Sequence, residues 1–208
     1  MSGYIDITRP VNETLVAWPG RAPPRHRWVQ RIASGDHCNA SFWELSAHSG
    51  THMDAPLHFI DKGLGIDEID PGVFFGPCRV IELGSGPLGE GSARELLGVE
   101  RLLIKTAHSL LPVSGVYQAH DRLMTEPAAT RLVEHGLRLI GTDRLSVDDS
   151  KGQGYPLHRL FLGAGCVIVE GLLLAEVGPG AYELFAAPLR LAGTEASPVR
   201  AILKRRTR

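Results

Sequence analysis

The sequence has little cysteine, no excess of charge of either sign and no long hydrophobic run. Its 208 residues carry 22 basic and 23 acidic side chains, so the formal net charge is −1 with histidine neutral. A dedicated nucleic-acid binder needs surplus basic charge to neutralise phosphates, and this chain has none to offer. The three cysteines, Cys38, Cys78 and Cys166, have no CxxC spacing, which favours a reducing compartment over a disulfide framework.

The hydrophobic segments are too short to cross a bilayer. A strongly apolar stretch such as residues 163–174 contains a charged residue and falls well below the roughly 20 residues of a transmembrane helix. The opening MSGYIDITRP has neither a basic leader nor an apolar core, so we expect no signal peptide. We therefore expect a cytoplasmic protein that acts on a small-molecule substrate, with neither a nucleic acid nor a membrane as its partner.

The overall composition is that of an ordinary globular protein. The chain is 43% hydrophobic, contains 24 glycines and 14 prolines, and has no internal repeat. We expect residues 1–208 to form a single domain. The last five residues, KRRTR, carry four positive charges, and we expect them to form a solvated, frayed tail.

Short apolar runs predict many strands and few helices. We predict strands at residues 4–8, 42–47, 78–83, 101–105, 137–142, 167–170, 182–187, 189–192 and 199–203. A helix is predicted over residues 126–135, because Thr125 is a suitable N-cap and Gly136 follows the last turn. A second helix is predicted over residues 156–163, which begin with proline and end with glycine. This pattern indicates an α/β or α+β sandwich or barrel-like sheet.

Three of the nine histidines fall in one short window, HSGTHMDAPLH, as His48, His52 and His58, together with Asp54. A zinc-binding helix is disfavoured, because a glycine lies between the first two histidines and a proline follows the aspartate. An extended or turning segment places His52 and Asp54 on one face. Imidazole and carboxylate groups are ligands for Zn²⁺, Mn²⁺ or Fe²⁺. Ordinary loop histidines beside a turn-forming aspartate are the alternative.

The string SGTHMDAPLH resembles the signature of the cyclase family of metal-dependent hydrolases, which includes bacterial kynurenine formamidases. The resemblance extends to DITRP, the Trp18-Pro19-Gly20 turn, GPCRVIEL, LIGTDRLSVDDSK and YELFAAPLRLAGTEASPVRAIL, and so covers nearly the whole chain. It implies an α/β fold of the swivelling β/β/α type, with a central mixed β-sheet or barrel and a few flanking helices. It also implies assembly as a homodimer or homotetramer.

The resemblance further implies a set of site residues. One or two Zn²⁺ or Mn²⁺ ions per subunit would be held by His48, His52, Asp54, His158 and Glu170, with Asp54 able to bridge, and His58 would be the acid/base histidine. Without the resemblance, His158 is interpreted as a histidine on a helix face. Glu170 ends a buried apolar strand, where a carboxylate is costly unless it is paired or binds a metal.

The activity that follows is hydrolysis of an amide by a metal-activated water, with His58 protonating the departing amine. An arylformamide such as N-formyl-L-kynurenine is the predicted substrate. The stretch SKGQGYPLHR has one histidine where the formamidases have an adjacent pair, so an isatin-type lactam or a lactone remains the alternative. A non-enzymatic metal-binding or ligand-binding protein is less favoured, because histidine and carboxylate ligands without cysteine are typical of open catalytic sites.

Several other residues have two interpretations each. In GTDRLSVDD, Asp143, Ser146, Val147 and Asp148 resemble a family loop near the site, although a plain turn explains Asp148 equally well. No GxSxG motif surrounds Ser146, so it is not predicted to be a nucleophile. Trp18 and Trp43 belong either to an aromatic pocket or to the core. The remaining histidines lack partner spacing and are predicted to be surface or core residues: His26, His37, His108, His120 and His135.

Overall fold

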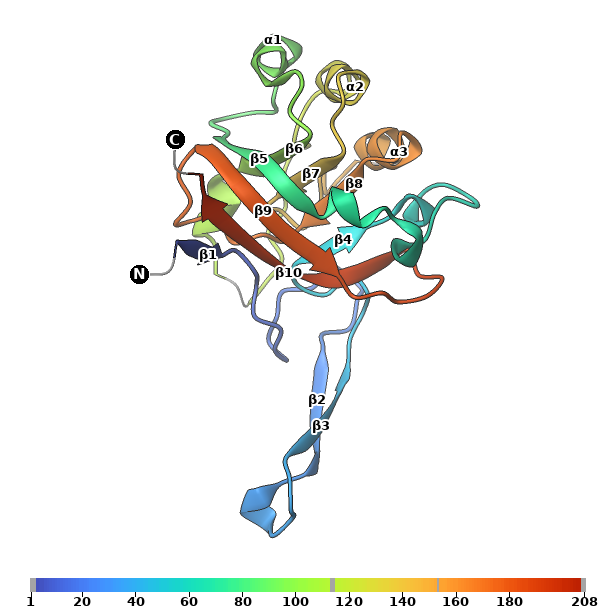
Figure 1. The fold of residues 1–208 in the computed structure, drawn as a ribbon, viewed down its shortest axis with the longest axis vertical. Coiled ribbons are helices and arrows are strands. Elements are labelled where there is room, and N and C mark those ends of the chain that lie inside the picture. Colours follow the sequence, from blue (N-terminus) through green and yellow to red (C-terminus); the bar gives the residue numbers. More distant parts are fainter. Residues whose placement is uncertain (1–2, 113–114, 153, 207–208) are drawn as a thin grey trace.

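A closed, mixed β-sheet forms the centre of the computed structural model, which describes residues 3–112, 115–152 and 154–206. The sheet has the strand order β1-β10-β4-β8-β7-β6-β5-β9, and β9 also pairs with β10. This last pairing closes a ring and leaves β1 outside it, beside β10 (Figure 1). The predicted α/β fold with a central mixed sheet or barrel and few helices is confirmed.

The elements follow one another along the chain with short connections. The strands are β1 (Tyr4–Asp6), β2 (Arg25–Gln30), β3 (Ala40–Glu44), β4 (His52–Asp54), β5 (Phe75–Glu82), β6 (Arg101–Lys105), β7 (Leu139–Thr142), β8 (Val167–Glu170), β9 (Gly180–Pro188) and β10 (Ala196–Arg205). The α-helices are α1 (Glu90–Ala93), α2 (Glu126–Glu134) and α3 (Pro156–Gly163). The 3₁₀ helices are η1 (Ile32–Ser34), η2 (Pro56–His58), η3 (Ile66–Glu68), η4 (Pro71–Val73), η5 (Arg94–Leu96) and η6 (Ala107–Leu110).

Strands β5 to β8 run parallel and are covered on both faces. Alternate residues divide between two apolar layers, with Leu103 and Val169 inside the barrel and Leu102 and Ile168 beneath the helices. Because both faces are buried, these strands appear in the sequence as continuous apolar runs. The predicted runs at residues 101–105 and 167–170 are therefore confirmed as β6 and β8.

The helices lie together on one side of the sheet (Figure 1). Both predicted helices are confirmed as α2 and α3, whereas the single-turn helix α1 was not predicted. The Thr125 side chain accepts a hydrogen bond from the Ala128 N–H at the start of α2, and Gly136 adopts a left-handed φ of 96° after its end. In the described part of the chain, no helix is both long enough and apolar enough to span a membrane.

Two strand-level predictions are wrong at the end of the chain. Residues 189–192 are not a strand but part of the connection between β9 and β10, where Leu189 and Leu191 are exposed and make no ladder. Lys204 and Arg205 do not fray, because they extend β10 and pair with β9. Cross-strand hydrogen bonds outweigh the solvation of these two charges, and residues 207–208 lie outside the described residues.

A β-hairpin, formed by β2 and β3, projects away from the body of the molecule (Figure 1). We call residues 25–44 the arm. Its second strand is Ala40–Glu44 rather than the predicted 42–47, and its first strand was not predicted, because its mixture of arginine and aromatic residues has no clear alternation. At the other end of the sheet, β1 stops at Asp6, two residues before the predicted end, and Thr8 makes only an isolated bridge with Leu172.

Candidate metal centre and active site

Strand pairing brings the separate motifs of the sequence together. Strand β4 lies between β10 and β8, and the register of β4 with β8 places His52 opposite Glu170, more than a hundred residues along the chain. His158 approaches from the first turn of α3, His48 from the turn before β4, and His58 from η2 after it. The extended segment predicted around His52 is therefore confirmed.

A close backbone contact allows β8 to approach the turn that carries His48. Gly171 has a left-handed φ of 70°, and a Cβ atom there would lie 2.5 Å from the carbonyl oxygen of Gly50. The Gly171 carbonyl accepts hydrogen bonds from the Thr51 hydroxyl at 2.7 Å and from Nε of buried Arg9 at 3.0 Å. These contacts fix the backbone on both sides of the histidine and carboxylate cluster.

The five residues expected to be ligands lie within a few ångströms of one another. Nε2 of His52 lies 3.5 Å from both Asp54 Oδ1 and Glu170 Oε2. Nε2 of His158 lies 3.3 Å from Glu170 Oε1 and 3.7 Å from Asp54 Oδ2. Nδ1 of His48 lies 2.9 Å from Asp54 Oδ1. Asp54 is therefore the central carboxylate of the cluster.

Two groups of side chains around Asp54 have the spacing of metal ligands. In one group the ligand atoms of His48, Asp54 and His58 lie within 4.8 Å of one another, and in the other those of His52, Asp54 and Glu170 do so. The arrangement has room for one or two ions that share Asp54. His58 was expected to be an acid/base residue, yet its position is also close enough for ligation.

The outer nitrogens of two histidines are held by hydrogen-bond acceptors. Nδ1 of His52 lies 3.1 Å from the Gly50 carbonyl, and Nδ1 of His158 lies 2.7 Å from Asp148 Oδ2. A carbonyl or an ionised carboxylate can only accept, so each Nδ1 carries the proton. The lone pair of each Nε2 then faces the carboxylates, as in metal-binding histidines oriented by an outer carboxylate or carbonyl.

Two carboxylates that orient histidines were not identified from the sequence. Asp148, which was interpreted as either a family loop or a plain turn, is buried and accepts the N–H groups of Leu157 and His158 at the start of α3, each at 3.0 Å. Glu195 lies 3.1 Å from Nε2 of His48. Only the family-like segment around Glu195 marked that region, and nothing in the sequence distinguished its carboxylate from others.

The Asp148 carboxylate is expected to control metal affinity through His158. Asp148→Asn replaces one of two acceptor oxygens with a donor, so either the cap of α3 or the His158 orientation is lost, and metal affinity falls by about 10–100-fold. Competition against a chromophoric chelator on metal-stripped protein measures the change. Asp149→Asn is the matched control, because Asp149 bonds only the exposed Lys151 N–H. Equal affinities for the two variants would contradict the assignment.

The buried charges of the cluster need a cation. Neither oxygen of Asp54 has a hydrogen-bond partner among the described residues, although both are buried. Burial by itself raises the pKa of this carboxyl, but the imidazoles of His52 and His48 outweigh burial and lower it. Burial also lowers the pKa of His52, yet Asp54 and Glu170 raise that pKa to about 9. Two carboxylates at one centre thus match the charge of a divalent cation, which can replace the imidazole protons.

His58 has a different electrostatic environment from the other histidines. Burial lowers its pKa, and the nearby imidazoles of His48 and His158 act in the same direction, so together they outweigh the opposing effect of Asp54. The His58 ring is 4.4 Å from the His48 ring, centroid to centroid. A neutral imidazole at neutral pH can accept a proton and then donate it, which suits an acid/base residue.

A cavity of about 290 Å³ opens onto these histidines. Its walls include the aromatic side chains of Trp18, Phe59 and Tyr155, and the Trp18 ring packs edge-on against Tyr117 with centroids 5.1 Å apart. Trp18 therefore belongs to a pocket rather than to the core. Trp43 belongs to neither, because it lies half-exposed on the arm beside His26.

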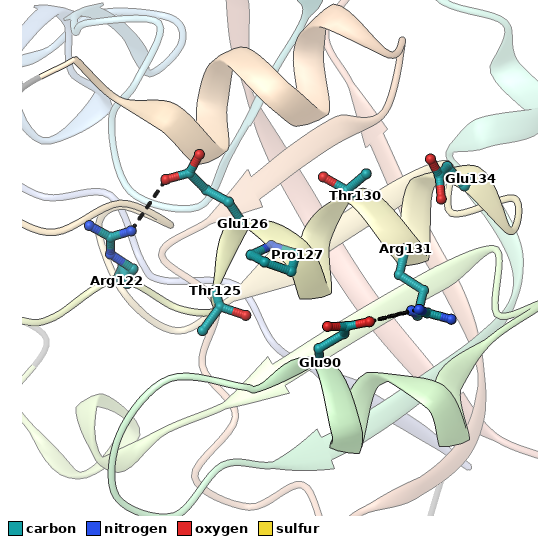
Figure 2. A pocket seen from close by; sticks show the side chains of 8 residues that line it. All are labelled: Glu90, Arg122, Thr125, Glu126, Pro127, Thr130, Arg131 and Glu134. Atoms are coloured by element: carbon teal, nitrogen blue, oxygen red, sulfur yellow. Dashed lines mark hydrogen bonds and ion pairs between the residues drawn. The ribbon is translucent and has the colours of Figure 1, made fainter.

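A larger depression of about 660 Å³ lies on the outer side of α1 and α2 (Figure 2). Its charged side chains are already paired, with Arg131 2.7 Å from Glu90 and Arg122 3.5 Å from Glu126. Both metal-ligand groups found in the described residues are at the smaller cavity instead. The smaller cavity is therefore the candidate active site.

Comparison with known proteins agrees with this site. The chain matches a family described as putative cyclase over residues 5–149. It is 36% identical to kynurenine formamidase from Geobacillus thermodenitrificans strain NG80-2, with 99% of each chain covered. It superposes on a potential metal-dependent hydrolase with cyclase activity at a TM-score of 0.78 and 28% identity, over 98% of both chains. For isatin hydrolase A from Ralstonia solanacearum the TM-score is 0.80, over 96% and 90% of the chains, but at 22% identity this likeness concerns the fold alone.

The closed sheet and its histidine and carboxylate centre define a hydrolase that depends on a metal cofactor. The chain belongs to the cyclase family, as the sequence predicted. The family match ends at residue 149, so His158 and Glu170 lie beyond it, but both fall within the nearly full-length similarity to the formamidase.

Proposed function

We propose that this hydrolase cleaves the C–N bond of an arylformamide, with N-formyl-L-kynurenine as the candidate substrate. The observation that carries the proposal is the cavity with three aromatic walls beside His58, which suits an aryl ring next to a scissile amide. Similarity to a kynurenine formamidase over 99% of both chains supports the same substrate.

The proposed ligands are His48, His52, Asp54, His158 and Glu170, and they would hold one or two ions per subunit. Nitrogen and oxygen donors without sulfur suit Zn²⁺ and, with two carboxylates, also Mn²⁺. The fit rests on the two unpartnered oxygens of Asp54 and on the inward Nε2 atoms of His52 and His158. When bound, such a metal lowers the pKa of a coordinated water and polarises a carbonyl oxygen.

The protein's own side chains would move the proton and hold the ring. His58 accepts a proton as water adds to the formyl carbon, and it returns that proton to the amide nitrogen as the C–N bond breaks. Formate and an arylamine are the products. An arylamine is a less basic leaving group than an alkylamine, so one histidine suffices for its departure. Trp18 and Phe59 flank the ring.

A substrate comparison tests the proposal. The purified protein, with its metal content determined, is assayed on N-formyl-L-kynurenine, a series of ring-substituted formanilides, isatin and a lactone, and kcat/KM is compared for each. We expect N-formyl-L-kynurenine to be preferred. No hydrolysis of any formamide, together with opening of isatin or the lactone, would overturn the proposal. The single histidine in SKGQGYPLHR is the observation that keeps this cyclic-substrate alternative.

We also propose that the protein is a homodimer or homotetramer whose copies meet through the arm. A two-stranded hairpin alone is marginally stable in water, and this one exposes Trp28, Val29 and Phe42. The residues at its base, Pro24 and Ser46, line the catalytic cavity. A second copy packed on the arm would bury these apolar side chains close to the cavity mouth.

The arm accounts for assembly if its apolar side chains are required for it. Trp28→Ser combined with Phe42→Ser is expected to shift the molar mass, measured by light scattering after size exclusion, from a multiple of the subunit to the single subunit. Leu189→Ser is the matched control, because Leu189 is equally exposed but lies outside the arm. A wild-type monomer, or an assembly unchanged in the double variant, would argue against the arm as the interface.

We propose the cytoplasm as the compartment of the protein. The three cysteines are free, and Cys78 and Cys166 are buried. Burial raises the pKa of the Cys78 thiol to about 12, so this group remains a neutral thiol. Free thiols of this kind suit a reducing compartment, and cell fractionation of the source organism is the direct test.

A further inference from the structure

A tight turn carries an arginine to the catalytic cavity. In the sequence Trp18-Pro19-Gly20-Arg21, the Arg21 N–H donates to the Trp18 carbonyl at 2.9 Å, and Gly20 has a left-handed φ of 83°. A Pro-Gly pair with positive φ at the glycine is the pattern of a type II turn. The turn therefore fixes the backbone of Arg21 relative to Trp18, and both residues line the cavity.

Arg21 is the one lysine or arginine among the residues that line this cavity. Within the described part of the chain, its guanidinium takes part in no ion pair and no side-chain hydrogen bond, and the residue is exposed. The metal-ligand groups and Glu170 lie at the inner end of the cavity. An unpaired cation is thus available to a ligand whose other end reaches His58.

We propose that Arg21 determines specificity by binding a carboxylate of the substrate. This inference rests on the proposed function and narrows it to arylformamides whose ring bears an anionic side chain, in preference to neutral ones. A guanidinium binds a carboxylate through two parallel charge-assisted hydrogen bonds, which a lysine cannot reproduce. Because the contact is remote from the scissile bond, it acts on the ground state and the transition state alike, so it lowers KM and leaves kcat nearly unchanged.

Two substrates that differ only in the charged group test the inference. N-Formyl-L-kynurenine carries the amino acid side chain, whereas 2-formamidoacetophenone keeps the ring, ketone and formamide without it. Arg21→Ala is expected to raise KM for the first by about 10–100-fold, as is typical for loss of hydrogen bonds to a charged group, with little change for the second. Arg21→Lys should recover part of the loss. Equal changes for both substrates, or none, would overturn the inference.

A matched variant and a binding measurement separate this inference from the proposed function. Arg25→Ala removes a neighbouring exposed arginine that does not line the cavity, and KM for both substrates should stay at the wild-type value. If the wild type hydrolyses neither formamide, the proposed function fails, and binding of L-kynurenine, followed by tryptophan fluorescence, decides the role of Arg21. Weaker binding by Arg21→Ala supports the carboxylate site. Equal binding by both proteins, or binding by neither, overturns it.

Discussion

Asp54→Asn is expected to remove both the metal and the activity. Asp54 belongs to both groups of potential ligands, and its two buried oxygens have no other partner in the described structure. The amide that replaces it carries no charge and turns a donor toward the ion position. No other carboxylate can bridge in its place, so activity should fall by more than the roughly 10²–10⁴-fold typical of losing an acid/base residue.

Metal analysis of the purified variant, together with kcat/KM on the preferred substrate, measures both losses. Asp61→Asn is the matched control, since Asp61 is an exposed aspartate after η2 and belongs to neither group of ligands. Circular dichroism establishes that both variants fold. A variant at Asp54 that keeps the wild-type metal content would contradict the central position assigned to this carboxylate.

His58→Ala is expected to separate chemistry from metal binding. We expect kcat to fall by about 10²–10⁴-fold, because no other group is assigned to protonate the departing amine, while the metal content stays nearly unchanged. The lowered pKa of His58 supports a proton-transfer role, since the neutral ring can act first as a base.

The alternative for His58 is ligation together with His48 and Asp54, whose ligand atoms lie within 4.8 Å of it. If His58→Ala loses metal in proportion to activity, His58 is a ligand and the acid/base role must be reassigned. His37→Ala, at an exposed position near the tip of the arm, is the control for histidine removal. Activities measured in both the zinc and manganese forms distinguish loss of metal from loss of proton transfer.

The sequence by itself determined the elements whose signals are local. The buried run at residues 101–105 and the capped helix after Thr125 are both present, because side-chain burial and capping act within a few residues. The spacing of His52 and Asp54 likewise required only an extended backbone to place them on one face. The full ligand set, in contrast, came from family resemblance, and its metal-binding roles stay a prediction.

The tertiary structure decided what depends on register and packing between distant segments. The pairing of β4 with β8 places His52 opposite Glu170, and the position of α3 brings in His158. Asp148 looked like a turn residue until the packing of α3 placed its carboxylate against the imidazole of His158. Residues 189–192 had a strand-like pattern but no neighbouring strand with which to pair. Local propensity cannot determine such contacts, because their energy arises only when segments far apart in the chain meet in one register.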